Sequence, residues 1–220
     1  MSNGGALLTA FNELSRLLYR PLKDAIIVVS GLPRSGTSMM MRMLQAGGLE
    51  VVTDNRRIAD DSNPLGYYED ERVKRLRDGH PEWLDSAIGK AVKIVSPLLE
   101  YLPARHVYKL IFMLRSVEEI VASQRRMLSR QGETAAKETD EDLAVVYRNH
   151  LRRIEAWLVD QPHFETMYVH YRDIIEDADG HARRISHFAR RPLDRHAMVA
   201  AVDGNLYRER FDHPGCVRDE

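Results

Sequence analysis

Short apolar runs alternate with polar stretches along most of the chain. Five of these runs cover residues 25–29, 51–52, 91–95, 107–114 and 166–169, and the first of them is rich in β-branched residues. A short, continuous apolar run bounded by turn residues is typical of a strand that is buried on both faces, as in a parallel sheet. The pattern therefore predicts about five buried strands.

Apolar residues recur at helical spacing between these strands. They predict a helix that follows the first strand and ends near residues 47–48, and further helices over residues 117–128, 143–159 and 181–190. The same spacing predicts a helical segment within residues 1–23, packed on the domain. Strands that alternate with helices indicate an α/β fold. We expect a three-layer sandwich, with a central, mainly parallel sheet of about five strands and helices on both faces.

Length and composition fit a single domain over residues 1–220. The chain is 44% hydrophobic, which is enough for one buried core. It has one cysteine, Cys216, and no run of 18 apolar residues, so we expect a cytoplasmic protein with no membrane span and no secretory signal. A net charge of −1 gives no overall field to attract nucleic acid. Residues 131–142 are polar and aperiodic, which predicts an exposed loop, with a mobile lid as the alternative.

A glycine-rich turn at residues 31–38 follows the first strand and opens a helix. Backbone N–H groups and the positive end of the helix dipole can hold a phosphate at such a turn. Gly31 and Gly36 have the spacing of a phosphate-binding P-loop, but Thr37 stands where an ATP or GTP site has lysine, and a cation comes earlier, at Arg34. We therefore expect a P-loop type of nucleotide-binding fold that lacks the usual clamp for γ-phosphoryl transfer.

The alternative is a turn that only connects the strand to the helix. The hydroxyls of Ser35, Thr37 and Ser38 would then serve as helix caps. A cap needs one hydroxyl, whereas this turn combines three hydroxyls with two glycines and an arginine. The combination favours an anion-binding loop.

A second candidate anchor for an anion follows the fourth predicted strand. Arg115 comes directly after the apolar run, and open α/β sheets bind ligands beyond the carboxyl ends of their strands. Ser123 lies eight residues further on, in the next predicted helix. These two residues share a site only if the turn between strand and helix folds back, and a surface arginine with a helix-face serine is the alternative.

The two segments together resemble the sulfotransferase family, whose donor is 3′-phosphoadenosine 5′-phosphosulfate (PAPS) and whose product is 3′,5′-adenosine bisphosphate (PAP). The resemblance implies that Arg115 and Ser123 receive the 3′-phosphate and that Tyr171, in a segment similar to the family's late strand and helix, lies near the adenine. It also implies that the 5′-phosphosulfate lies against Pro33, Arg34, Ser35, Gly36, Thr37 and Ser38.

The catalytic centre departs from the cytosolic members of that family. Lys93 and the proline four residues later match their pattern, but their catalytic histidine falls on Val95 here, and valine cannot accept a proton. Other members use a glutamate located after the phosphate loop, and Glu69 is the matching candidate base. Arg34 and Lys93 would supply positive charge to the transferred group. The alternative for Glu69 is a favourable charge at a helix N-terminus.

The resemblance implies transfer of the sulfuryl group from PAPS to a hydroxyl or amine of a small molecule, glycan or protein, by in-line displacement and without a metal. A P-loop kinase of a small molecule or nucleotide is an alternative, disfavoured by Thr37 and by Arg115 in place of a magnesium-binding aspartate. A non-catalytic nucleotide-binding module is another, because Val95 removes the usual base. The C-terminal Arg208 and Arg210 are candidates for a donor-phosphate contact, with a solvated tail as the alternative.

Overall fold

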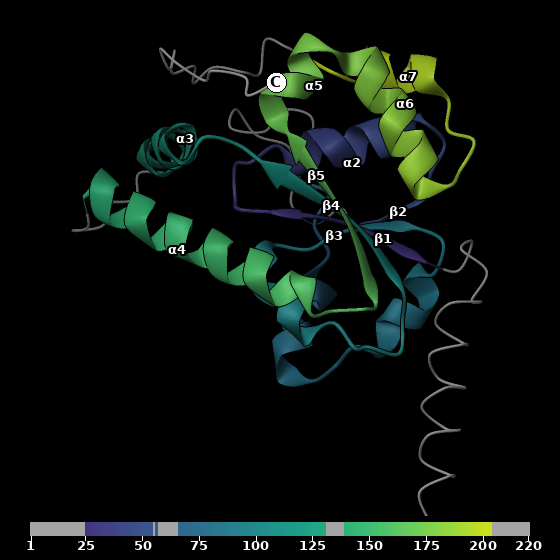
Figure 1. Ribbon diagram of the computed structural model, residues 1–220, viewed down its shortest axis with the longest axis horizontal. Helices are drawn as coiled ribbons and strands as arrows, with labels where there is room; N and C mark the ends of the chain where they lie inside the picture. Colours follow the sequence, from purple (N-terminus) through teal and green to yellow (C-terminus); the bar gives the residue numbers. More distant parts are fainter. Residues whose placement is uncertain (1–24, 55, 57–65, 131–138, 204–220) are drawn as a thin grey trace, which may run out of the picture.

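The computed structural model describes residues 25–54, 56, 66–130 and 139–203 (Figure 1). Three predictions fall outside this part of the chain: the helical segment within residues 1–23, the contact of Arg208 or Arg210 with the donor, and residues 131–138 of the expected loop. No helix among the described residues is both long and apolar enough to cross a membrane.

A five-stranded sheet in the order β2-β3-β1-β4-β5 forms the centre of the domain, and every neighbouring pair is parallel. All five strands therefore end at the same edge of the sheet. The strands are β1 (Ile26–Gly31), β2 (Val51–Val52), β3 (Ala91–Lys93), β4 (Tyr108–Leu114) and β5 (Phe164–His170).

Helices connect the strands. The α-helices are α2 (Thr37–Ala46), α3 (Val117–Arg130), α4 (Asp140–Val159), α5 (Tyr171–Glu176), α6 (Ala178–Ala189) and α7 (Arg195–Ala200). The segments before and after β3 form short 3-10 helices instead of α-helices. These are η2 (Glu71–Asp78) and η3 (Glu82–Ala87) before β3 and η4 (Ser96–Tyr101) after it.

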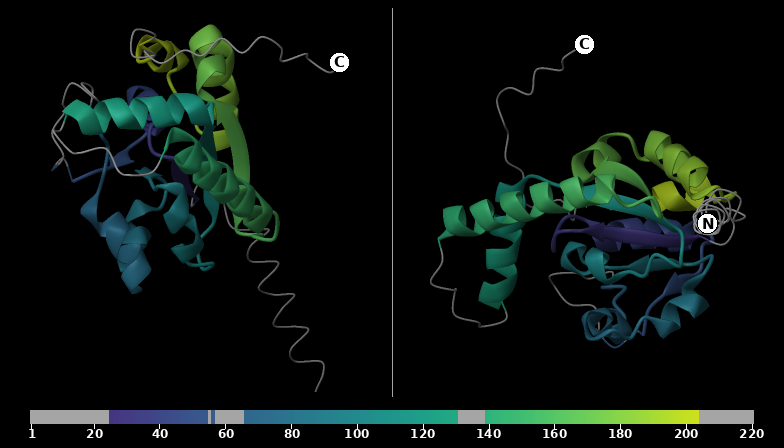
Figure 2. Two further views of the ribbon diagram at one scale, coloured as in Figure 1. Left: turned by 90° about the vertical axis from the view of Figure 1, so that its left-hand side faces the viewer. Right: turned by 60° about the horizontal axis from the view of Figure 1, so that its bottom comes forward.

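Alternate residues of the central strands enter two separate cores. Ile27 and Val29 of β1 pack with α2, α5, α6 and α7 on one face of the sheet. Ile26 and Val28 pack with α4 and the 3-10 helices on the other. Figures 1 and 2 show α5, α6 and α7 together on one side of the sheet, with the 3-10 helices on the opposite side. The predicted three-layer α/β sandwich is confirmed.

The structure corrects the end of the predicted loop 131–142. Thr139 and Asp142 form a capping box in which each side chain accepts from the other residue's backbone N–H, so residues 140–142 are the first turn of α4. An exposed first turn carries acidic residues without apolar periodicity, which is why the pattern predicted a helix only from residue 143.

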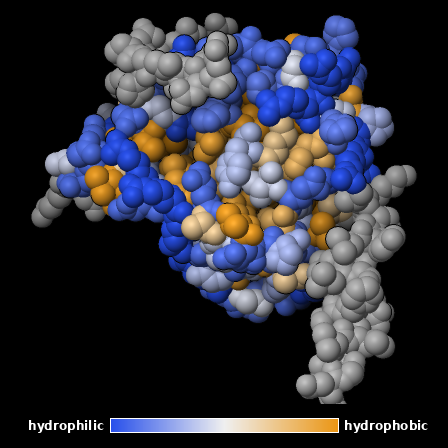
Figure 3. All heavy atoms as spheres, viewed as in Figure 1, coloured by the Kyte–Doolittle hydropathy of each residue, from blue (hydrophilic) through white to orange (hydrophobic). Residues whose placement is uncertain are grey.

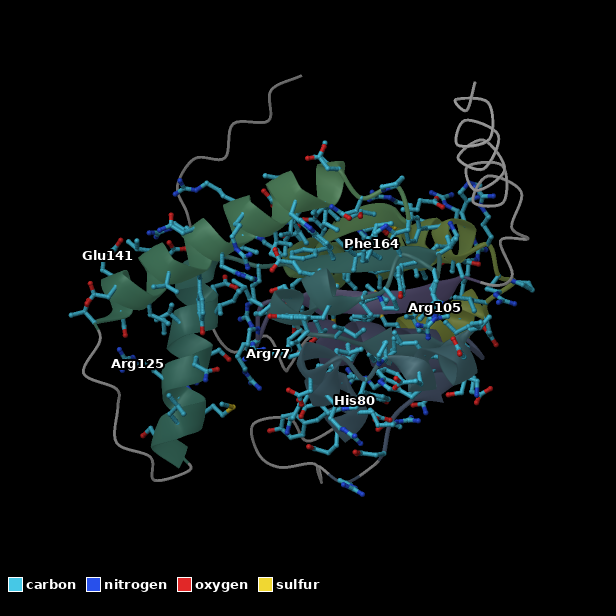
Figure 4. All side chains as sticks on the ribbon, turned by 90° about the horizontal axis from the view of Figure 1, so that it is seen from below. Arg77, His80, Arg105, Arg125, Glu141 and Phe164 are labelled. Atoms are coloured by element: carbon cyan, nitrogen blue, oxygen red, sulfur yellow. The ribbon has the colours of Figure 1, made fainter. Side chains whose placement is uncertain are left out.

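The pair formed by α3 and α4 extends away from the sheet. Val117 and Val121 of α3 pack against Ala144 of α4, and Nε of Arg125 lies 2.8 Å from Oδ1 of Asp140. Figure 4 shows Glu141 at the outer end of α4 and Arg125 partway along α3, both well away from Phe164 at the start of β5. The contact between the helices fixes the direction in which α3 leaves β4.

One lysine lies inside the core. Lys109 of β4 is fully buried, and its ammonium pairs with the Glu165 carboxylate of β5 at 2.5 Å. The ammonium also lies 4.7 Å from the centre of the Phe188 ring of α6. Its four-carbon stem fills space between β4 and α6, so the side chain contributes packing as well as charge.

Packing should dominate the contribution of this lysine to stability, because Glu165 is half exposed and water can solvate its carboxylate. We expect Lys109→Ala to lower the free energy of unfolding by about 2–5 kcal/mol, since it leaves a cavity. Lys109→Met keeps most of the volume and should cost less than about 1.5 kcal/mol. Urea unfolding of the two variants measures the difference. Equal losses would show that the ion pair, and not the packing, stabilises this region.

Candidate active site

The glycine-rich turn joins β1 to α2 at the carboxyl edge of the sheet. Backbone φ is positive at Gly31 (147°), Arg34 (69°) and Gly36 (103°). A Cβ at Gly31 would lie 2.5 Å from the Ser35 hydroxyl and 2.6 Å from the carbonyl oxygen of Met113. The turn is therefore tight and is packed directly on the end of β4, and only glycine fits at its first position.

Gly36 is held against an aromatic ring. A Cβ at this position would overlap the ring of Tyr171, the first residue of α5. Tyr171 is itself buried, and burial raises the pKa of its phenol above the ordinary value. The Tyr171 ring thus packs against the loop directly after the end of β5.

The hydroxyls of the loop do not cap α2. Gly36 is the N-cap residue, and no side chain makes a capping hydrogen bond there. The Ser35 hydroxyl is buried and has no hydrogen-bond partner among the described residues, while Thr37 is buried at the first helical position. A buried hydroxyl without a partner beside a helix N-terminus suits an anionic ligand. The structure therefore excludes the capping alternative.

The second candidate anchor reaches the loop. Nε of Arg34 donates to the hydroxyl of Ser123 at 3.0 Å, and a terminal nitrogen of Arg115 donates to the backbone carbonyl of Arg34 at 3.2 Å. The turn between β4 and α3 folds back in the way that a shared site requires. Arg34, Arg115 and Ser123 thus form one cluster at the end of β1 and β4.

Two neighbours hold the Arg115 guanidinium in place. Its Nε donates to a carboxylate oxygen of Glu119 at 2.8 Å, and both side chains are less than 10% exposed. The guanidinium carbon lies 5.0 Å from the centre of the Tyr171 ring. Glu119 was not predicted from the sequence, although its position four residues after Arg115, at the start of the helix predicted over residues 117–128, was a signal for this pair.

A second cluster surrounds the ammonium of Lys93, at the end of β3. Nζ donates to the carbonyl oxygen of Tyr67 at 2.8 Å, to the hydroxyl of Ser38 at 3.3 Å and to Oε1 of Glu69 at 3.4 Å. The Lys93 side chain is only 9% exposed and that of Glu69 is 33% exposed. Lys93 and Glu69, predicted separately, thus lie together beside the second half of the loop.

Glu69 does not act as the N-terminal charge of the helix that follows it. Asp70 has that role, because its side chain accepts from the backbone N–H of Arg72 at 3.0 Å and η2 begins at residue 71. The Glu69 backbone carbonyl accepts from the hydroxyl of Thr53 at 3.1 Å. The backbone of Glu69 is therefore held by a hydrogen bond to Thr53, while its carboxylate points toward Lys93.

The two clusters can perform distinct chemical tasks. Arg115 and Ser123 offer donors to one anionic group, and the loop, with Arg34 and Lys93, offers donors to another. The Glu69 carboxylate beside Lys93 can accept a proton. The described residues hold no group of three His, Cys, Asp or Glu side chains that could bind a metal ion.

Solved structures of sulfotransferases share this fold. Sulfotransferase STF1 from Mycobacterium tuberculosis H37Rv is 20% identical with a TM-score of 0.54, and the match covers 89% of this chain and 76% of that chain. Mouse sulfotransferase SULT7A1, complexed with PAP, is 14% identical with a TM-score of 0.54, covering 88% of this chain and 69% of that chain. No curated protein sequence matches the chain.

The sequence itself matches a known domain. Residues 23–209 match the sulfotransferase domain, which is most of the chain and includes the glycine-rich loop and both clusters. The sheet order, the loop between β1 and α2 and the arginine after β4 agree with that assignment. The chain belongs to the sulfotransferase domain family.

Proposed function

We propose that this sulfotransferase transfers the sulfuryl group of PAPS to a hydroxyl or amine and that Glu69 accepts the proton which the acceptor loses. The observation that carries this assignment is the contact of Lys93 with both Ser38 of the loop and Glu69. It brings a cation and a carboxylate to the end of the loop that receives the transferred group. Membership of the family and the fold support PAPS as the donor and PAP as the product.

The donor's two anionic ends suit the two clusters. Arg115 and Ser123 are assigned to the 3′-phosphate, because a guanidinium can offer two parallel N–H donors to a dianion. The 5′-phosphosulfate is assigned to the loop amides, the hydroxyls of residues 35, 37 and 38, and the Arg34 side chain. Tyr171, between the loop and Arg115, is assigned to the adenine end.

The transfer needs a base near the acceptor, which attacks sulfur, and positive charge near the phosphate oxygen, which leaves. As the acceptor oxygen or nitrogen forms its bond to sulfur, the bond from sulfur to the 5′-phosphate oxygen breaks, and the acceptor's proton passes to the Glu69 carboxylate. Lys93 and Arg34 stabilise the charge that develops on the sulfuryl and departing phosphate oxygens. No residue forms a covalent intermediate. Val95, which replaces the histidine of cytosolic members, takes no part in proton transfer.

The alternatives lose support at particular residues. A kinase needs a loop lysine for the terminal phosphates, and Thr37 occupies that position. A non-catalytic binding module would not need a carboxylate beside Lys93, yet Glu69 is directed there. The acceptor is assigned only to the class of hydroxyl or amine compounds, in a small molecule, a glycan or a protein.

The donor assignment predicts strong binding of PAP. Arg115→Ala removes a charge-assisted contact to the 3′-phosphate and should weaken binding by roughly 10- to 100-fold. Arg172→Ala is a matched control, because Arg172 forms an ion pair with Glu176 at the same i,i+4 spacing but on the exposed surface of α5. Calorimetric titration with PAP, and separately with ATP and magnesium, measures both effects. Preference for ATP with magnesium would contradict the assignment and favour the kinase.

The base assignment predicts a loss of turnover without a loss of donor binding. Glu69→Gln keeps the size of the side chain but cannot accept the proton. With a hydroxyl or amine compound that the unchanged protein sulfates, the rate of sulfuryl transfer should fall by roughly 10²- to 10⁴-fold. PAP affinity should change little. Glu71→Gln is the control, since Glu71 pairs with Lys74 on the surface two residues away. Full activity of the Glu69 variant would assign the proton to another group.

A further inference from the structure

A basic pocket lies at the end of α6, away from both clusters of the active site. Its volume is about 650 Å³, which is within the range of pockets that hold small ligands, about 300–1,000 Å³. Its lining includes four arginines and a histidine and no acidic residue. The lining residues are Arg183, Ser186, His187, Arg190, Arg191, Pro192 and Arg195.

Three of the four pocket arginines lack a carboxylate partner within the described residues. Within the described part of the chain, no ion pair joins Arg183, Arg190 or Arg195 to an acidic side chain. Exposed arginines elsewhere do form such pairs, as Arg153 does with Glu100 at 2.7 Å. Figure 3 shows a largely hydrophilic surface over α6 and α7. The guanidinium groups of Arg183, Arg190 and Arg195 line one hollow and repel one another, and a bound anion would reduce that repulsion.

The backbone gives the pocket its shape. The chain turns at Arg190, where φ is 50° and α6 ends. The hydroxyl of Ser186 donates to the backbone carbonyl oxygen of Arg191 at 2.7 Å. The backbone N–H of Asp194 donates to the backbone carbonyl oxygen of Gly47 at 3.0 Å. The side chain of Asp194 caps α7 by accepting from Ala197. The turn is thus tied to α6 and α2, and the arginines of α6 and α7 line one hollow.

The pocket and the donor loop are at opposite edges of the sheet. Tyr171, the first residue of α5, contacts Gly36 at the carboxyl edge. Phe188, near the end of α6, lies over Lys109 in the amino-terminal half of β4. Along α6, which begins at Ala178, Arg183 lies about 8 Å and Arg190 about 18 Å from the first residue, at 1.5 Å per residue. The pocket residues from His187 to Arg195 therefore lie at or beyond the carboxyl end of α6, which is the end farther along the chain from Tyr171.

We propose that this pocket is a second anion site that binds a compound with two or more phosphate or sulfate groups. The planar guanidinium offers paired donors that fit the oxygens of such groups. A single small anion would leave most of the arginines uncompensated, whereas a linked pair or triplet of anionic groups can contact several of them within one pocket of this volume. The proposal does not depend on the chemistry assigned to Glu69 or Lys93.

The test uses the full chain saturated with PAP, so that the donor site is filled. Titration with tripolyphosphate should show one further binding event that weakens as salt concentration rises. Arg183→Ala should lower the affinity for tripolyphosphate by about tenfold or more. Arg184→Ala is the matched control, because Arg184 is the next residue of the same exposed helix but does not line the pocket. Its affinity should stay within about twofold.

The second variant is Arg195→Ala, because Arg195 lines the pocket from the start of α7. It should weaken tripolyphosphate binding as Arg183→Ala does, and neither variant should change the affinity for PAP. Parallel titrations with ATP and with a trisulfated disaccharide identify whether phosphate or sulfate groups are preferred. Equal losses for Arg183→Ala and Arg184→Ala would mean diffuse charge attraction and would overturn the proposal. So would the absence of a second binding event, or tighter binding of a short DNA duplex with the same dependence on Arg183.

Discussion

The contact between Gly36 and the ring of Tyr171 is the constraint on which the donor site depends. It leaves no room for a side chain at position 36 of the loop and holds the loop after β1 against the residue that follows β5. The same ring lies under the guanidinium of Arg115. One aromatic side chain therefore sets the relative positions of the loop and the arginine after β4, and dense packing transmits any change in one to the other.

The positive charges of the active site are held by the protein before any ligand binds. Glu119 fixes Arg115, and Ser38, Tyr67 and Glu69 surround the ammonium of Lys93. Buried cations without such partners would carry a large desolvation penalty. The partners also keep the donor groups oriented, so that little reorganisation is needed when the anionic substrate arrives. In the basic pocket at the end of α6, by contrast, no described carboxylate pairs with Arg183, Arg190 or Arg195.

Hydrophobic patterning predicted the fold because every central strand is buried on both faces and so forms a continuous apolar run. Local motifs also predicted the loop and Arg115, since the chemistry of each is concentrated in a few adjacent residues. The contact between Lys93 and Glu69 joins segments 24 residues apart, and local spacing does not encode how they meet. Glu119 was missed although its spacing from Arg115 is local. The 3-10 helices η3 and η4 were missed because six residues are too few for a helical period to emerge.

Lys93 joins the donor loop to the segment between β2 and β3. Its ammonium bonds to Ser38 of the donor loop and to the segment of Tyr67 and Glu69, which follows β2. An exchange of the region between β2 and β3 with that of a relative would therefore also exchange the candidate base. A chimaera intended to change only the acceptor would have to keep residues 66–70 from this chain, with its junctions on either side of them.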